Sequence, residues 1–433
     1  MKIVIIGAGS HCFGFGTVVD ILRAPALQRQ HESVEVALVD PDTAALERVY
    51  AAALRLRDHL GVTTTISATA ERREALPGAD FVVVSVARRR WVLWEQDFRV
   101  PLAHGFRHVL GENGGPGAVF HALRSFELIL PICRDIEALC PTALMLNFTN
   151  PEARVLHAVC HLTRVRAAGL CHGVFGAIRR LSEYLGRPAA NFEVTSAGMN
   201  HFYCVLRVTD RATGADLLPQ ALAAAAADTR PESSPLFRHF ARVFDVFTFP
   251  SEDHIGEYVS FGSEFQGTQW HYGIERRRLR LTEPPAVDWL GDYAAGRLAA
   301  DDPRVVRPSG EVAVPLICDV ATDAGGRHDA MNVLNTGGYI ENLPRDGVVE
   351  VPGTADAAGL HPLVVGPLPE AFAAFMRPQY TIHSLLTEAY RTRSRKLLLQ
   401  ALLLDPVVNS ITQAEAMLGE MLALQAEFLP TFA

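Results

Sequence analysis

A thiol and an imidazole near the middle of the chain have the chemistry of metal ligands. Cys171 closes an apolar run that is typical of a strand, and His201 follows another such run. Brought together at the carboxyl edge of a sheet, a thiolate and an imidazole can bind a divalent ion and leave positions open for substrate oxygens. Spacing alone fits a buried cysteine and a hydrogen-bonded core histidine more simply.

The N-terminus predicts a dinucleotide site. The apolar run Lys2–Ile6 leads into Gly7-Ala-Gly9-Ser10-His-Cys-Phe-Gly14. The first glycines allow a tight turn and close approach of backbone N–H groups to a pyrophosphate, and the following helix points its positive end at that charge. Gly7, Gly9, Ser10 and Gly14 are therefore the expected contacts. The third glycine comes late for G-x-G-x-x-G, and a turn without a ligand is the alternative.

Two further residues are assigned to the same cofactor. Asp40 ends the second expected strand, where a carboxylate meets the ribose hydroxyls and repels a 2′-phosphate, so NAD is favoured over NADP. Asp40 could instead cap the helix that begins at Pro41-Asp42-Thr43. Asn147 ends another expected strand. His11 and Cys12, in the glycine turn, receive no role.

The first half of the chain alternates apolar β-branched runs with helical patterns, which predicts an α/β fold with a doubly wound, Rossmann-type parallel sheet. The expected strands are Lys2–Ile6, Val34–Val39, Phe81–Val86, Ala143–Asn147 and Ala167–Cys171. The expected helices are Thr17–Ala24, Ala44–His59, Ala118–Leu139 and Ala177–Tyr184.

The pattern changes near Asn191. Phe192–Ser196 and Tyr203–Val208 are expected to be antiparallel strands, and the chain ends in two long helical patterns, Pro369–Leu404 and Val408–Phe428. The Pro-, Gly- and Asp-rich stretch Pro284–His328 is expected to be a surface excursion. We therefore expect an NAD-binding domain over 1–195 and an α+β domain for substrate, metal and oligomerisation over 196–433.

Composition limits the class of protein. A chain of 433 residues is long for one core, and its net charge of −8 disfavours non-specific binding to nucleic acid or an anionic membrane. No 18-residue apolar span or cleavable leader is visible. The seven scattered cysteines suit reduced thiols, so a cytoplasmic protein is expected.

Six blocks occur in an order that resembles glycoside hydrolase family 4, from Lys2 to beyond Asn409. After the glycine turn they are Gly111-Glu-Asn-Gly-Gly-Pro-Gly-Ala, Asn147-Phe-Thr-Asn-Pro-Glu152, Gly169-Leu-Cys-His-Gly-Val174, Gly198-Met-Asn-His-Phe202, Asn335-Thr-Gly-Gly-Tyr-Ile-Glu-Asn-Leu-Pro344 and Gln400-Ala-Leu-Leu-Leu-Asp-Pro-Val-Val-Asn409. The resemblance implies a nucleotide-binding architecture like that of the lactate and malate dehydrogenases.

The resemblance also implies a chemistry outside the two-carboxylate scheme of glycoside hydrolysis. NAD⁺ oxidises the sugar at C3, a base removes the C2 proton, and the aglycone leaves from C1. Water then adds, and the hydride returns. A divalent ion, usually manganese, polarises the C3 carbonyl. The net reaction is hydrolysis without net redox change.

The positions that match the family's motifs imply which residues form the site. Cys171 and His201 match the metal ligands, and Asn200 should sit beside the metal. Asn150 matches a residue that contacts both the nicotinamide region and the sugar hydroxyls, and His172 would reach the sugar.

The acid and the base are less defined. Glu112 lies where the family places an acid near the leaving oxygen, or it is a carboxylate at a helix N-terminus. Members acting on plain α-glycosides carry Asp-x-His-x-x-Glu where this chain has Glu252-Asp253-His254-Ile-Gly-Glu257. Glu252 falls on the usual position of the base and Asp253 is offset by one. Tyr258 is the third candidate.

The residue after the metal cysteine indicates the sugar class. Cys171-His172 points to a non-phosphorylated sugar, and Cys-His-Gly is closest to the α-glucuronidase pattern, although Val174 replaces a Phe. A uronate needs a cation, for which Arg88-Arg89-Arg90 are candidates, unless that run is a solvated face or a pyrophosphate contact. A neutral α-hexoside (galactoside, glucoside or an uncommon epimer such as a guloside) is the alternative to an α-glucuronide.

Two other classes compete with a glycosidase, namely a plain NAD-dependent dehydrogenase and a catalytically idle NAD-binding regulator. The Cys171/His201 pair disfavours both. The expected partners are a small carbohydrate and further copies of the chain in a homodimer or homotetramer built on the apolar C-terminal helices.

Overall fold

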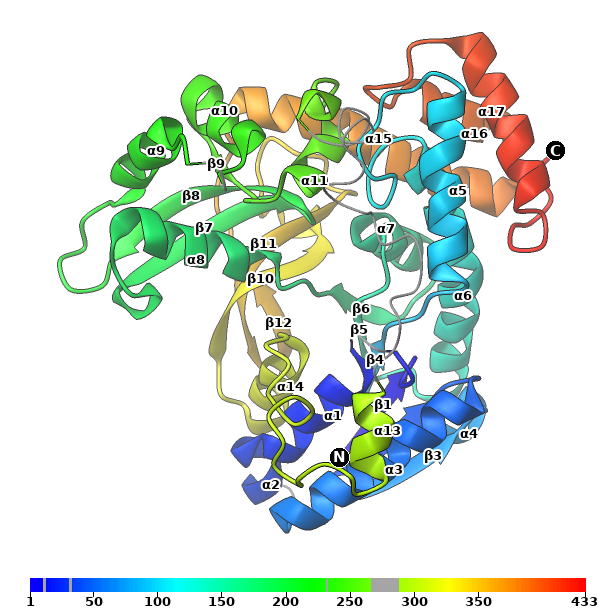
Figure 1. The fold of residues 1–433 in the computed structure, drawn as a ribbon, viewed down its shortest axis with the longest axis vertical. Helices are drawn as coiled ribbons and strands as arrows, with labels where there is room; N and C mark the ends of the chain where they lie inside the picture. The colour runs from blue at the N-terminus through cyan, green and yellow to red at the C-terminus, as the bar shows by residue number, and fades with distance from the viewer. Residues whose placement is uncertain (11–12, 31–32, 231–232, 266–287) are drawn as a thin grey trace.

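The computed structural model describes residues 1–10, 13–30, 33–230, 233–265 and 288–433, so His11 and Cys12 lie outside the described residues. Within these ranges one sheet of 12 strands runs through the molecule (Figure 1), in the order β3-β2-β1-β4-β5-β6-β10-β11-β7-β8-β9, with β12 paired to β11. A search of the same ranges finds no helix with the length and apolarity needed to cross a bilayer.

The first half of the sheet is parallel and has the order 3-2-1-4-5-6 of a dinucleotide-binding fold. Its strands are β1 (Lys2–Ile6), β2 (Glu35–Val39), β3 (Thr65–Thr69), β4 (Phe81–Val84), β5 (Leu144–Asn147) and β6 (Arg166–Gly169). Val4 and Ile6 of β1 enter one core, whereas Ile3 and Ile5 enter another. Because successive side chains face opposite sides of a strand, continuous apolar runs suit a sheet covered on both faces. The predicted Rossmann-type, doubly wound fold is confirmed.

Helices cover both faces of this parallel sheet. On one face lie α1 (Gly14–Arg23), α2 (Pro25–Gln30), α3 (Thr43–Leu60), α13 (Trp289–Ala294) and α14 (Ala313–Thr322). The core on the other face is built mainly from α4 (Arg72–Ala75), α6 (Gly117–Leu139), α7 (Glu152–Leu162), α15 (Glu370–Thr392), α16 (Arg395–Leu403) and α17 (Ile411–Leu424), with α5 (Arg90–Ala103) packed on α6.

Antiparallel strands extend the sheet beyond β6. They are β7 (Phe192–Met199), β8 (Phe202–Asp210), β9 (Phe247–Thr248), β10 (Gly326–Leu334), β11 (Val348–Asp356) and β12 (Gly359–Pro362). Around them lie α8 (Gly173–Leu185), α9 (Leu218–Ala227), α10 (Pro235–Phe244), α11 (Glu252–Ile255) and the short 3₁₀ turns η1 (Ala189–Asn191), η2 (Gly256–Tyr258), η3 (Gly262–Glu264) and η4 (Asn335–Gly337). The expected antiparallel pairing of β7 and β8 is confirmed. β10 pairs with β6, so residues on both sides of the predicted boundary at 195 share one sheet.

Two expectations for the second half are wrong. The described part of Pro284–His328 is not wholly a surface excursion, because α14 buries Leu316 and Ile317 beside α1 and α2 (Figure 1). Pro369–Leu404 is not one helix. Arg393 adopts a left-handed conformation (φ +58°) that ends α15, and Ser394 then caps α16.

A buried ion pair ties the C-terminal tail to the nucleotide-binding half. Arg124 of α6 donates from Nη1 and Nη2 to the two carboxylate oxygens of Asp97 on α5, at 2.9 and 2.5 Å. Arg124 Nη1 also donates to Gln425 Oε1 just after α17 at 2.6 Å. Burial raises the pKa of Asp97, which is fully enclosed. The carboxylate therefore depends on Arg124 for its compensation.

Replacing Arg124 with Leu should lower the free energy of unfolding by about 3–5 kcal/mol, because Asp97 would keep a buried charge without a partner. Arg99 of α5 forms an exposed ion pair with Glu95, so Arg99→Leu is the matched control and should cost about 0.5 kcal/mol or less. Urea unfolding followed by tryptophan fluorescence measures both. Equal, small losses in the two variants would show that the buried pair does not hold the tail.

Candidate active site

The glycine turn lies at the crevice where the strand order reverses between β1 and β4. Gly7 has φ +89°, and a Cβ there would lie 2.0 Å from the carbonyl oxygen of Ser85, just after β4. A Cβ on Gly14, the first residue of α1, would lie 1.9 Å from the carbonyl oxygen of Ala8. Only glycine fits at either position, because a side chain would clash with the backbone of Ser85 or Ala8, and this close packing forms the tight turn at the switch point.

Asp40 and its neighbour have different roles at this crevice. Asp40 Oδ2 accepts the N–H of Gly9 at 2.8 Å, which ties the end of β2 to the glycine turn. Asp42, not Asp40, is the N-cap of α3, because Asp42 Oδ1 accepts the N–H of Ala45 at 3.0 Å. The alternative in which Asp40 caps this helix is therefore wrong.

Ser10 and Asn147 shape the loops around the crevice. Ser10 Oγ accepts the N–H of Phe13 at 3.4 Å, one residue before α1. Asn147 is fully buried, and its amide bonds the backbone N–H and carbonyl of Thr149 at 3.1 Å each. Asn147 thus ends β5, and its side chain holds the turn that leads to Asn150.

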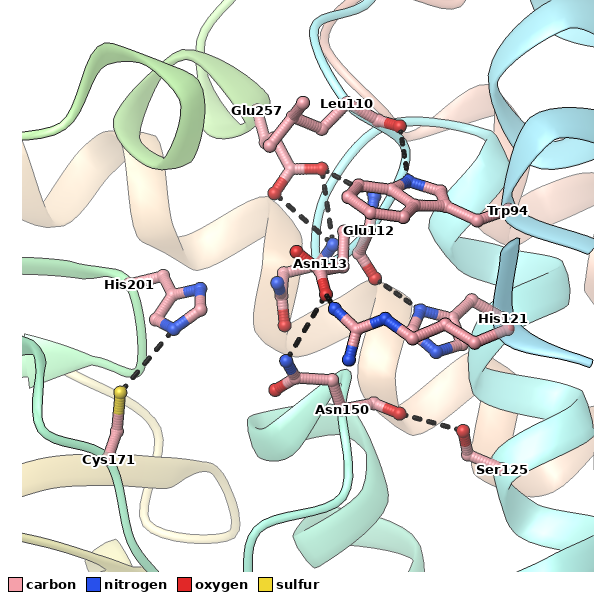
Figure 2. Close-up of polar contacts among 11 residues, drawn as sticks. Trp94, Leu110, Glu112, Asn113, His121, Ser125, Asn150, Cys171, His201 and Glu257 are labelled. Atoms are coloured by element: carbon pink, nitrogen blue, oxygen red, sulfur yellow. Dashed lines mark hydrogen bonds and ion pairs between the residues drawn. The ribbon is translucent and has the colours of Figure 1, made fainter. Parts of the chain in front are cut away.

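Cys171 and His201 meet, as Figure 2 shows. Cys171 lies two residues beyond β6, His201 lies in the two-residue turn between β7 and β8, and Cys171 Sγ is 3.5 Å from His201 Nε2. His201 has φ +84°, a conformation uncommon for a residue with a side chain and one that clusters at functional sites. Its ring stacks on that of His254 with centroids 4.2 Å apart.

The pair fits a divalent cation. With bonds of about 2.3 Å to sulfur and about 2.1 Å to nitrogen, one cation separates two such donors by roughly 3–3.6 Å. Burial holds the pKa of His201 well below its usual value, which keeps the ring in the neutral form that binds metals. Burial and the Glu350 carboxylate raise the pKa of Cys171 to about 12. Within the described ranges, no group of three or more His, Cys, Asp or Glu side chains is placed to hold a metal.

His172 and Asn200 flank the pair differently. His172 is exposed, and its Nδ1 lies 2.9 Å from Glu311 Oε1, just before α14. Asn200 is buried, and its Nδ2 donates to Glu350 Oε2 of β11 at 3.1 Å. Its Oδ1 has no hydrogen-bond partner within the described part of the chain, which leaves one oxygen acceptor beside the pair.

Glu112 and Asn150 face the pair from the other side of the site (Figure 2). Glu112 Oε1 accepts from Arg90 Nη2 at 2.7 Å and from Asn150 Nδ2 at 3.4 Å. Glu112 is nearly enclosed, and Arg90 is partly exposed. The carboxyl group of Glu112 is held by Arg90 and Asn150 rather than by the first turn of α6, so it is not a helix cap.

Glu257 orders the loop that carries Glu112 (Figure 2). Its Oε1 accepts the backbone N–H of Glu112 at 2.7 Å, and both of its oxygens accept that of Asn113 at 3.2 Å. A Cβ on Gly114 would lie 2.5 Å from the carbonyl oxygen of Glu257. The sequence predicts no role for Glu257, although Glu257 is part of the motif that begins at Glu252. The glycines of the Glu112 loop are the one feature of the sequence that indicates a close neighbour there.

The three candidate bases are placed differently. Glu252 is buried, and its Oε1 accepts the N–H of Leu236 at 2.6 Å, in the first turn of α10. Tyr258 is buried, and its hydroxyl donates to the backbone oxygen of Asn200 at 3.3 Å. Asp253 is half-buried and immediately precedes His254, the residue stacked on His201.

Comparison with known proteins gives the family. The model of the family 4 glycosyl hydrolases matches residues 2–187, and the model of their C-terminal domain matches residues 196–408. The chain belongs to family 4 of the glycosyl hydrolases. The two matches meet close to the predicted domain boundary, which stays a prediction.

Relatives of this family 4 glycosyl hydrolase span its full length. It is 30% identical to an alpha-glucosidase from Erwinia rhapontici, over 99% of this chain and 98% of that protein. It is 29% identical to an alpha-galactosidase from Bacillus subtilis, over 100% of this chain and 99% of that protein. It is 24% identical to an alpha-galacturonidase from Lachnoclostridium phytofermentans, over 99% of this chain and 97% of that protein.

Solved structures agree on the fold. A 6-phospho-beta-glucosidase from Thermotoga maritima, determined with manganese, NAD⁺ and glucose-6-phosphate, superimposes with a TM-score of 0.83 at 24% identity, over all of both chains. A malate dehydrogenase from Plasmodium falciparum, solved with NADH, gives a TM-score of 0.51 at 13% identity, over 92% of this chain and 99% of that one. The predicted dehydrogenase-like architecture is confirmed.

Glu257→Gln should lower kcat/KM for glycoside cleavage, by up to about 10²-fold if the Glu112 loop shifts by about 1 Å. The amide nitrogen of Gln cannot accept an N–H, so one of the carboxylate's acceptor atoms is lost. The exposed Glu264 lies nearby, and Glu264→Gln is the control. Steady-state kinetics together with thermal melting measure the effect. A variant with full activity would show that Glu257 does not order the site.

Proposed function

We propose that this family 4 glycosyl hydrolase cleaves a non-phosphorylated α-hexoside or α-hexuronide, using NAD and a divalent ion such as Mn²⁺. The observation that carries the proposal is the convergence of Cys171 and His201 at 3.5 Å, with Glu112 and Asn150 facing them across the site (Figure 2). A plain dehydrogenase needs a hydride acceptor alone. A soft and a borderline metal ligand beside the nucleotide crevice provide for a Lewis acid as well.

The chain's own residues would hold both cofactors. The turn over Gly7, Gly9, Ser10 and Gly14 and the start of α1 would receive the pyrophosphate, and Asp40 would bond the ribose hydroxyls. Cys171 and His201 would ligate the ion, with Asn200 beside it. When bound, the nucleotide would supply a hydride acceptor and the ion a Lewis acid.

The remaining residues orient the sugar and move protons. Asn150 would bond sugar hydroxyls, and His172 would reach the same ring from the exposed side. We assign the C2 base to Asp253, because it adjoins His254, whose ring stacks on that of the proposed ligand His201. Glu252 and Tyr258 are the alternatives. A carboxylate suffices for a proton made acidic by a neighbouring ketone. Glu112, fixed by Arg90, would stand near the leaving oxygen.

Two observations bear on the sugar. Arg90 is already paired with Glu112, and the Arg89 guanidinium lies over the Phe428 ring at 5.8 Å, so Arg88 is the member of the Arg88–Arg90 run left for a uronate. The α-glucuronide prediction thus rests on Arg88 and on Cys171-His172-Gly173. The pairing of Arg90 and the alpha-glucosidase and alpha-galactosidase relatives favour a neutral α-hexoside, which we test first.

We further propose that the enzyme is cytoplasmic and self-associates through its C-terminal helices. α17 and the residues before it expose the large apolar side chains Leu404, Ile411 and Leu424. Such side chains on neighbouring helices suit an interface between copies of the chain.

A panel of nitrophenyl α-hexosides and α-hexuronides, assayed with and without NAD⁺ and Mn²⁺ under reducing conditions, tests the function. We expect aglycone release from at least one substrate only when both cofactors are present, without net accumulation of NADH. Deuterium at C2 should slow turnover, since that bond breaks before the aglycone leaves. Release that needs no NAD⁺ would overturn the mechanism, and no release from any substrate would overturn the assignment.

Cys171→Ser should abolish Mn²⁺-dependent turnover while the fold is retained, because a hydroxyl is a poor replacement for a thiolate ligand. Cys318→Ser is the matched control, since Cys318 lies on α14 and is half-buried. Removal of the metal by a chelator should reduce the wild type to the level of Cys171→Ser, and added Mn²⁺ should restore only the wild type and Cys318→Ser. Full activity and metal affinity in Cys171→Ser would show that the ligand is misassigned.

A further inference from the structure

A row of paired residues crosses the junction between the parallel and antiparallel parts of the sheet. The row runs across β6, β10, β11 and β7 through Gly169, Asn332, Glu350 and Gly198. In the described structure, the β6–β10 and β11–β7 pairings each consist of the single pair in this row. Cys171 follows one end of the row by two residues, and His201 follows the other by three. The row therefore links the two segments that carry the proposed ligands.

Side chains reinforce this narrow junction. Glu350 Oε2 accepts from Asn200 Nδ2 at 3.1 Å and from Asn332 Nδ2 at 3.2 Å. Asn332 Nδ2 also lies 3.3 Å from the carbonyl oxygen of Gly169. Asn332 is fully buried and Glu350 is 3% exposed. Glu350 Oε2 thus links the turn that carries His201, through Asn200, to the strand that leads to Cys171, through Asn332.

The described part of the chain supplies no cation to compensate a negative charge on Glu350. Among the described residues, no Lys, Arg or His forms an ion pair with it, and burial raises its pKa. A buried carboxylate with no cation nearby is costly. A thiolate at Cys171 and a carboxylate at Glu350 together carry two negative charges, which match one divalent cation.

We infer that Glu350 is a positioning residue for the metal site. With Cys171 it supplies the charge that balances a divalent cation, and through Asn200 and Asn332 it holds the two ligands at their separation. This inference rests on the proposed function, because it assumes that Cys171 and His201 bind the ion. Glu350 would act through Asn200 and Asn332.

The test is Mn²⁺ binding to Glu350→Gln, measured from the EPR signal of free Mn²⁺. The substitution keeps the shape and one acceptor oxygen but removes the charge. We expect the Mn²⁺ dissociation constant to rise about 10- to 100-fold, as for other groups that support metal ligands, while NAD⁺ affinity is unchanged. Glu341 is exposed on the connection between β10 and β11, and Glu341→Gln removes the same charge as a control. That control should bind Mn²⁺ like the wild type.

Thermal melting separates charge balance from a merely structural role. Without metal, Glu350→Gln should melt at or above the wild-type temperature, because an uncompensated buried charge is gone. Added Mn²⁺ should raise its melting temperature less than it raises that of the wild type. A purely structural Glu350 predicts a lower melting temperature with and without Mn²⁺. That result, or failure of Glu350→Gln to fold, would overturn the inference.

Failure of the inference is distinguishable from failure of the proposed function. If the wild type does not bind Mn²⁺, or if Cys171→Ser binds it with wild-type affinity, the proposed metal site itself is wrong. If the wild type binds, Cys171→Ser does not, and Glu350→Gln binds like the wild type, the proposed site stands and only the role of Glu350 is wrong.

Discussion

The contact between Cys171 and His201 depends on how two different sheets are joined into one. β6 ends a parallel, doubly wound sheet, and β7 begins an antiparallel hairpin. β10 and β11 lie between them, through one residue pair on each side. Since Cys171 follows β6 and His201 follows β7, any change in register at this junction would separate them. The buried polar side chains there are explained by that requirement.

The nucleotide crevice and the sugar site are neighbours for the same geometric reason. In a doubly wound sheet the carboxyl ends of the strands face one side, and ligands bind there, outside the point where the strand order reverses. The glycine turn follows β1, the Asn150 segment follows β5, and Cys171 follows β6. A fold shared with malate dehydrogenase thus brings the glycine turn, the Asn150 amide and the proposed metal ligands Cys171 and His201 to one edge.

Charge compensation is organised in pairs around this edge. Arg90 balances Glu112, Arg124 balances Asp97, and backbone N–H groups surround Glu257. Arg90 and Glu257 fix the loop that carries Glu112, whereas the Arg124–Asp97 pair joins α6 to α5. The pairing of Arg90 also changes how the Arg88–Arg90 run is understood, because a guanidinium that already holds a buried carboxylate is not available to a substrate.

Local patterns determined the Rossmann-type sheet, the position of the glycine turn and the antiparallel β7–β8 pairing, because apolar periodicity and glycine placement act within a few residues. The ordered motifs determined the family and the residues to examine. Only the tertiary structure decided which of these residues meet. The Glu252 carboxylate bonds the start of α10, the Asn147 side chain bonds the turn after β5, and Asp42 rather than Asp40 caps α3. Glu257 and Glu350 bond the loops that carry Glu112 and His201. Those roles depend on partners far away in the sequence, and no local pattern records them.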